Sequence, residues 1–269
     1  TMKKYFIAFV LIVASFEAVT AQQDAQYTQY MYNMNILNPA YAGSKGYTSI
    51  GLLGRTQWVG VEGAPRTVTL GVHSPLGKAV GIGLSVVHNE IGPVKEDNLF
   101  ADFSYTISTS REGKLAFGLK AGATFHDIGL VGLDLIDPND PFFSENINEV
   151  TPNIGAGLYF YKPNKFYISA SMPNILNSVH LDANGFKIGS ETQHFFGAVG
   201  YVFDLSEDFK LKPHALAKVA FDAPVSFDVN LNLFMYDFVE VGDWVHEHVS
   251  LDADIDYGFD TSCLMFDNV

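Results

Sequence analysis

The strongest hint of metal chemistry in this chain is the pair His246 and His248, which forms a His-x-His pattern among acidic residues. Two imidazoles supply only half of a typical tetrahedral metal site. The run Asp137-Pro138-Asn139-Asp140-Pro141 offers carboxylates at a spacing that calcium accepts, although Asp-Pro runs are more often turns. Because neither pattern completes a site, the sequence predicts no metal and no cofactor.

Candidate catalytic groups are equally sparse. No nucleophile elbow, phosphate-binding loop or pair of carboxylates can be placed on one scaffold. The single cysteine, Cys263, cannot form an internal disulfide, and the net charge of -14 opposes nucleic-acid binding. Five other histidines lie on separate segments without metal-ligand spacing: His88, His126, His180, His194 and His214. We therefore expect a protein that is not an enzyme and does not bind nucleic acid.

The elements that carry these residues follow one pattern from residue 47 to residue 242. Stretches of about ten residues alternate apolar with small or polar side chains, as Phe117 and Leu119 alternate with Gly118 and Lys120. A period of two places the two sets on opposite faces of a strand. Strands of about 9 to 11 residues cross a bilayer when tilted. The predicted fold is all-β, an antiparallel transmembrane β-barrel of the outer-membrane type that lacks its last strands; the alternative is a soluble secreted β-sandwich.

The connections between these stretches alternate in length. The expected strands cover residues 47–58, 65–74, 79–91, 98–109, 114–127, 151–161, 165–172, 191–205, 208–220 and 225–236, with a short addition at 239–242. Tight turns alternate with long links at residues 59–64, 92–97, 128–150 and 173–190. Outer-membrane barrels have short turns on the periplasmic rim and long loops outside. We therefore place the long links at the exterior, where 128–150 and 173–190 are candidate contacts for a partner.

The alternation also assigns the two faces of the barrel. A charge at mid-membrane on the lipid face costs about 2–4 kcal/mol, so charged residues within strands belong inside. The candidate lumen residues are Asp102, Lys120, Asp228 and Asn230. Apolar residues at the alternate positions are expected to face lipid: Leu99, Ala101, Phe103, Tyr105, Ile107, Val225, Phe227, Val229, Leu231, Leu233 and Met235.

The beginning of the chain indicates export. Lys3 and Lys4 precede a short apolar run, and small residues follow at 19–21, as in a secretory signal peptide. We assign residues 1–21 to a signal peptide and residues 22–46 to an N-terminal periplasmic or luminal segment. This segment either packs into the lumen or its mouth, where Arg55 or Lys120 meets its carbonyls, or only caps the first strand.

Two runs near the mature N-terminus, Gln26-Tyr27-Thr28-Gln29-Tyr30-Met31 and Asn38-Pro39-Ala40-Tyr41-Ala42-Gly43-Ser44, resemble the opening of the PorP/SprF family of type IX secretion system membrane proteins. Similar stretches continue to about residue 240. The candidate family-motif residues are Gln26, Tyr27, Gln29, Tyr30, Asn38, Pro39, Tyr41, Gly43, Arg55 and Trp58. The resemblance implies a barrel in the bacterial outer membrane that assists export or surface attachment of secreted proteins, such as gliding adhesins. It also implies adhesin-like proteins and other type IX secretion components as partners, and it brings no catalytic residues.

The resemblance ends near Gly242. Residues 243–269 are acidic and are interpreted as a tail outside the family, produced by a truncation or frameshift near residue 243. The alternative function is an outer-membrane channel or hydrophobic-solute transporter without a secretion role, in which Asp102, Lys120, Asn230 and Asn232 set selectivity.

Overall fold

One antiparallel sheet contains most of the chain in the computed structural model, which describes residues 30–132, 145–176, 179–183, 186–190, 193–220, 225–236, 239–249 and 258–266. Neighbouring strands follow the order β1-β2-β3-β4-β5-β6-β7-β10-β12-β13-β14-β15, and β11 pairs with β12. The hairpin of β8 and β9 forms a separate small sheet. The predicted all-β antiparallel barrel fold is confirmed.

Three short helical turns precede the sheet, and their bounds and those of the strands are as follows. The helical elements are η1 (Tyr30–Tyr32), α2 (Met34–Leu37) and η2 (Pro39–Tyr41). The first half of the sheet is β1 (Ser49–Thr56), β2 (Arg66–Leu76), β3 (Val80–Ile91), β4 (Val94–Ser108), β5 (Lys114–Ile128), β6 (Ile147–Lys162) and β7 (Phe166–Met172). The remaining strands are β8 (Val179–Ala183), β9 (Phe186–Ser190), β10 (His194–Tyr201), β11 (Phe203–Asp204), β12 (Phe209–Ala220), β13 (Val225–Met235), β14 (Val239–Val249) and β15 (Gly258–Phe266).

The two faces of the sheet follow the alternation in the sequence. On β4, Asp102 is 4% exposed and Phe103 is 49% exposed. Exposed and buried positions alternate in the same way along β10 and most of β13. Burying the polar face while exposing the apolar one is the reverse of a soluble sandwich and is the arrangement that a lipid environment stabilises. Among the described residues, no helix is long and apolar enough to cross a membrane.

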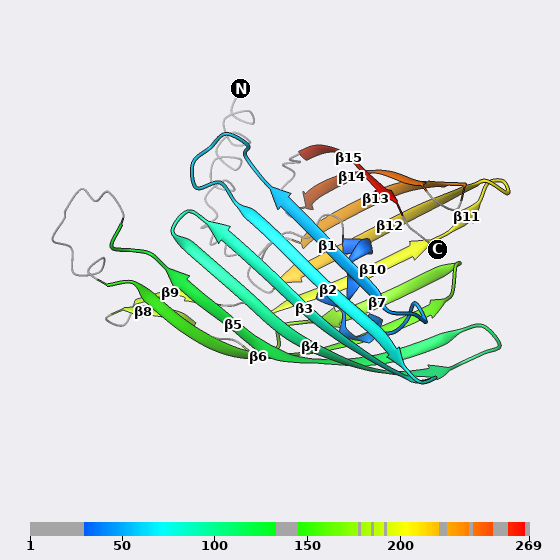
Figure 1. Cartoon of the computed structure of the whole chain (residues 1–269), viewed down its shortest axis with the longest axis horizontal. Helices are drawn as coiled ribbons and strands as arrows, with labels where there is room; N and C mark the ends of the chain where they lie inside the picture. The colour runs from blue at the N-terminus through cyan, green and yellow to red at the C-terminus, as the bar shows by residue number, and fades with distance from the viewer. Residues whose placement is uncertain are drawn as a thin grey trace, which may run out of the picture.

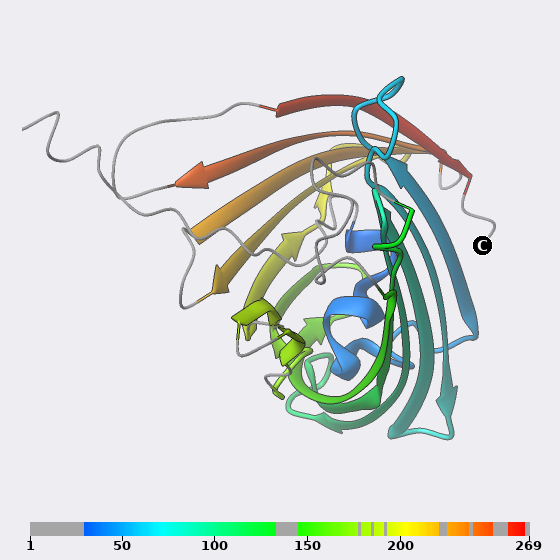
Figure 2. The same ribbon diagram turned by 90° about the vertical axis from the view of Figure 1, so that its left-hand side faces the viewer.

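The sheet curls around the helical turns, which lie inside it in Figure 2, and its long strands run diagonally across the view in Figure 1. Within the described residues, β1 pairs only with β2 and β15 pairs only with β14, so the curl is an incompletely closed barrel.

Several strand boundaries differ from the prediction: β6 begins at Ile147 and the hairpin of β8 and β9 lies within 179–190, where long links were expected. At two further boundaries, charged residues explain the difference. Residues 92–97 were expected to form a long link, but β3 and β4 are joined by a tight turn at Gly92, whose φ is 55°. Charged residues continue these strands because they pair across the ladder, as His88 Nδ1 and Asp97 Oδ1 do at 2.6 Å. At the other boundary, β14 crosses Gly242 and pairs with β13 along its whole length. The period-two alternation of the preceding strand continues in β14, but acidic residues make it hard to recognise in the sequence.

Several predicted features lie outside the described residues. These are the signal peptide at residues 1–21 and the Asp-Pro run at 137–141. The backbone of His246 and His248 belongs to β14, while their side chains are outside the description.

Candidate functional site inside the curled sheet

Residues 30–43, here called the inner segment, lie inside the curl (Figure 2). Every residue from Asn33 to Ala42 is buried. The local sequence explains the turn at its centre: the Asn38 side chain accepts a hydrogen bond from Ala40 N at 2.9 Å, and Pro39 occupies the first helical position. The inner segment is therefore a structured element rather than an extended leader to β1.

Asparagine side chains attach the inner segment to the wall. Asn38 Nδ2 donates to Leu158 O at 2.8 Å and to Ser169 Oγ at 2.7 Å, on β6 and β7. Asn33 Nδ2 donates to Thr69 Oγ1 at 3.3 Å, on β2. Because a buried amide costs free energy unless its hydrogen-bonding groups are satisfied, these bonds specify where the segment lies.

A buried ion pair holds the middle of the segment. Lys120 Nζ lies 3.1 Å from Asp102 Oδ1, and the two side chains are 1% and 0% exposed. Lys120 Nζ also donates to Asn35 O at 3.1 Å and to Ser85 Oγ at 3.4 Å. A buried ion pair must offset a large desolvation cost, and additional hydrogen bonds help it to do so. Lys120 therefore joins β3, β4 and β5 to the inner segment. Lys120 is one of the two cations that the sequence placed against the segment's carbonyls, and it bonds to the carbonyl of Asn35.

Glycines on the inner face allow the segment to come this close. A Cβ at Gly118 would lie 2.0 Å from Ala40 N, and a Cβ at Gly157 would lie 2.0 Å from Asn38 Oδ1. A Cβ at Gly81 would lie 2.0 Å from Ala42 O. These distances are impossible for any residue with a side chain, so the inner segment comes this close to the wall only because glycine is present. Together with Gly51 and Gly71, which would clash with Asn33, these residues form what we call the glycine seat.

Aromatic and apolar contacts fill the space around the polar bonds. The Tyr41 ring packs edge-on against Tyr159 at 5.3 Å and against His73 at 5.1 Å between ring centroids. Met34 and Leu37 belong to the same buried cluster. At the start of the segment, Asn232 Nδ2 on β13 donates to Tyr32 OH at 2.8 Å. The inner segment therefore contacts both halves of the sheet.

The segment leaves the interior through a fixed turn. Ser104 Oγ donates to Ala42 O at 2.6 Å, and Gly43 N donates to His73 Nδ1 at 3.2 Å. Gly43 has a φ of 74°, and a Cβ there would also lie 2.8 Å from Gly81 Cα. Both the backbone conformation and the space therefore require glycine at this position.

The structure distributes the motif residues unevenly. Tyr30, Asn38, Pro39 and Tyr41 are buried in the inner segment, and Gly43 ends it, whereas Gln26, Tyr27 and Gln29 lie outside the described residues. Arg55 is half-buried on β1, and Trp58 is 67% exposed beyond the end of that strand.

The candidate lumen residues fall into two places. Asp102 and Lys120 meet as the buried ion pair, while Asp228 and Asn230 are buried on β13, on a different part of the wall. The glycine seat was not predicted, because glycine-rich strands are common in barrels. The signal that would have revealed it is glycine at inward positions on several neighbouring strands.

The chemistry of this interior is that of a binding site for a chain segment. The polar groups that bond to the segment include amides, hydroxyls, the His73 imidazole and the Lys120 ammonium. Among the described residues, no three His, Cys, Asp or Glu side chains gather as a metal site requires.

Comparison with known proteins identifies the family. No curated protein sequence matches this chain. A family model described as "Type IX secretion system membrane protein PorP/SprF" matches residues 19–262. The matched region contains the inner segment, every strand from β1 to β14 and the start of β15, and it extends over residues 243–262, which the sequence had set apart from the family. The chain therefore belongs to the PorP/SprF family of type IX secretion system membrane proteins.

Proposed function

We propose that this protein is a non-enzymatic component of the bacterial outer membrane that assists the export or surface attachment of secreted proteins, such as gliding adhesins. Membership of the family establishes involvement in type IX secretion. The observation that supports the finer role is the inner segment, which occupies the interior of the curl and is bonded to β2, β5, β6 and β7.

An occupied interior favours an attachment role over free conduction. A passive channel needs a continuous aqueous path, and here the buried backbone of residues 33–42 lies against the wall. Contacts with an exported protein would then be made at the rims, where loops on a rigid scaffold usually bind partners. We assign the contacts with an exported protein to the rim of the sheet that carries the links β5–β6 and β7–β10. The expected partners are adhesin-like secreted proteins and other type IX secretion components.

Affinity purification of the tagged full-length protein from detergent-solubilised outer membranes tests the proposal. We expect surface proteins and secretion components to co-purify, and we expect a deletion strain to lose those proteins from its surface. Recovery of neither class, together with unchanged surface proteins in the deletion strain, would refute the role.

Conductance in a planar bilayer separates this function from the channel alternative. The intact protein should show little steady conductance because the inner segment occupies the interior. A stable open pore in the intact protein would favour transport of solutes instead.

A further inference from the structure

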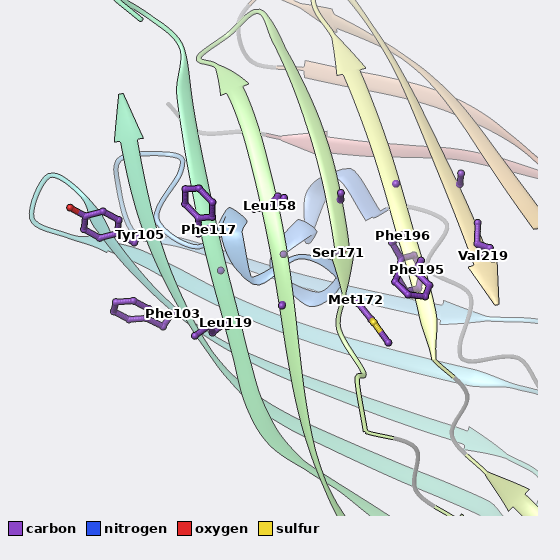
Figure 3. Close-up of a pocket in the computed structure, with 16 residues that line it drawn as sticks. Phe103, Tyr105, Phe117, Leu119, Leu158, Ser171, Met172, Phe195, Phe196 and Val219 are labelled. Atoms are coloured by element: carbon purple, nitrogen blue, oxygen red, sulfur yellow. The ribbon is translucent and has the colours of Figure 1, made fainter. Parts of the chain in front are cut away.

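An apolar groove of about 820 Å³, here called the outer groove, lies on the outward face of the sheet, across β4 to β7, β10 and β12. Figure 3 shows Phe103, Phe117 and Leu119 on one side of this groove and Phe195 and Val219 on the other. All five side chains are exposed, so the groove faces the surroundings of the barrel and not its interior.

Small residues form the floor of the outer groove. Ala170, Gly197 and Ala217 are direct neighbours across β7, β10 and β12. In the same row, Phe117 and Leu158 are large, so the floor is lower than its surroundings. A Cβ at Gly197 would meet nothing within 4 Å. The hollow is therefore not a result of tight packing, and a larger side chain would fit there without a clash.

Cations and aromatic rings border the outer groove toward the short turns. Lys165 Nζ lies 5.3 Å from the centroid of the Tyr201 ring, and Tyr201 is on the same face of β10 as Gly197. Lys162 likewise follows Leu158 along β6. At about 3.3 Å per residue, four residues separate the floor from this border by about 13 Å, which is within the roughly 15 Å of hydrocarbon in one leaflet.

Both lysines carry charge that is accessible to a ligand. Lys162 pairs with Glu112, and Lys165 Nζ lies 3.3 Å from Asp204 Oδ2. The hydrogen bond to Asp204 raises the pKa of the Lys165 ammonium, which therefore stays protonated. Exposed ion pairs are weak, and an ammonium has three N–H donors, so each lysine can also bind a phosphate oxygen.

We propose that the outer groove is a binding site for one phospholipid with an anionic headgroup, whose acyl chain lies over Ala170, Gly197 and Ala217 and whose phosphate binds Lys162 and Lys165. Tyr201 lies between the two parts, at the depth where aromatic rings prefer the membrane interface. Each strand in the groove is paired on both sides, so its backbone offers no free edge to a protein strand. An apolar lining next to cations fits an acyl chain joined to a phosphate.

Native mass spectrometry of the full-length, delipidated protein tests this site. Phosphatidylglycerol is the probe, and zwitterionic phosphatidylcholine is the comparison. We expect one phosphatidylglycerol to be retained. Gly197→Leu should abolish its retention by filling the hollow. Replacing both lysines, with Lys162→Gln and Lys165→Gln, should weaken phosphatidylglycerol binding roughly 30-fold and leave phosphatidylcholine unchanged.

Gly54→Leu is the matched control, because Gly54 is also exposed on a strand and its Cβ would meet nothing within 4 Å. Heat-modifiable migration on a denaturing gel confirms that each variant is folded. Equal retention by Gly197→Leu and Gly54→Leu, or no preference for phosphatidylglycerol, would overturn the proposal. So would a dimer that Gly197→Leu converts to a monomer, which would assign the groove to a second copy.

This inference rests on the proposed location of the chain in a bilayer, but its test does not depend on secretion. Loss of lipid binding with normal export would overturn the lipid site alone. Loss of co-purifying partners with lipid binding intact would overturn the proposed function alone.

Discussion

Replacing Lys120 by Met tests whether the buried ion pair holds the inner segment in place. Met preserves most of the side-chain volume, but it leaves the Asp102 carboxylate buried without its cation and removes the N–H donor to Asn35 O. Removal of one partner of a buried pair costs about 3–5 kcal/mol, and loss of a hydrogen bond costs about 1 kcal/mol. We expect the free energy of unfolding to fall by roughly 4 kcal/mol.

Urea titration of the full-length protein in detergent, followed by the heat-modifiable gel shift, measures this change. The double variant Lys120→Met with Asp102→Leu should recover most of the loss, because it leaves no charge buried. Lys78→Met, at an exposed turn, is the control and should remain within about 0.5 kcal/mol of the wild type. The reasoning fails if Lys120→Met lies within about 1 kcal/mol of the wild type, or if the double variant is less stable than the single one.

Three further changes probe the segment and the faces of the sheet. Gly118→Val should displace the inner segment, because its Cβ would lie 2.0 Å from Ala40 N, and bilayer conductance should therefore rise. An unchanged conductance, or an equal rise in the control variant Gly54→Val, would contradict this. Asn38→Ala should reduce the free energy of unfolding by about 3 kcal/mol, measured by urea titration, since three hydrogen bonds are lost; a change below about 1 kcal/mol would show that the bonds are dispensable. Phe103→Lys should reduce the free energy of unfolding in lipid vesicles by about 2–4 kcal/mol, because the charge would lie in hydrocarbon. A change within about 0.5 kcal/mol, the range usual for a solvated surface position, would contradict a lipid-facing position.

The sheet could be predicted from the sequence because its alternation is directly visible. Asp102 and Phe103 are neighbours with opposite chemistry, and placing one inside and one outside follows from the cost of a charge in hydrocarbon. The prediction failed where charged residues continue a strand, as around Asp97, because their polarity had indicated a loop. It also ended the barrel region at Gly242, where acidic residues obscure the continuing strand β14.

The interior was harder to predict because its residues meet across large separations in the chain. Lys120 was placed inside by its position on a strand, but its bond to Asn35 O depends on how the whole sheet curls. The inner segment contains no charge to indicate its partners. Gly118 and Gly157 belong to the glycine seat because they lack a side chain. The role of a missing side chain can be recognised only when the position of the opposing segment is known.

The contacts of the inner segment impose an order on assembly. Asn38 is synthesised early, but Ser169 follows 131 residues later, and Asn232 comes 200 residues after Tyr32. Contacts so distant in the chain form slowly, since the intervening loop must close before they contribute. The first described part of the polypeptide to leave the ribosome is therefore among the last to reach its final partners. Until then the amides of the inner segment remain hydrated, and its tyrosines and methionines remain exposed and accessible to chaperones.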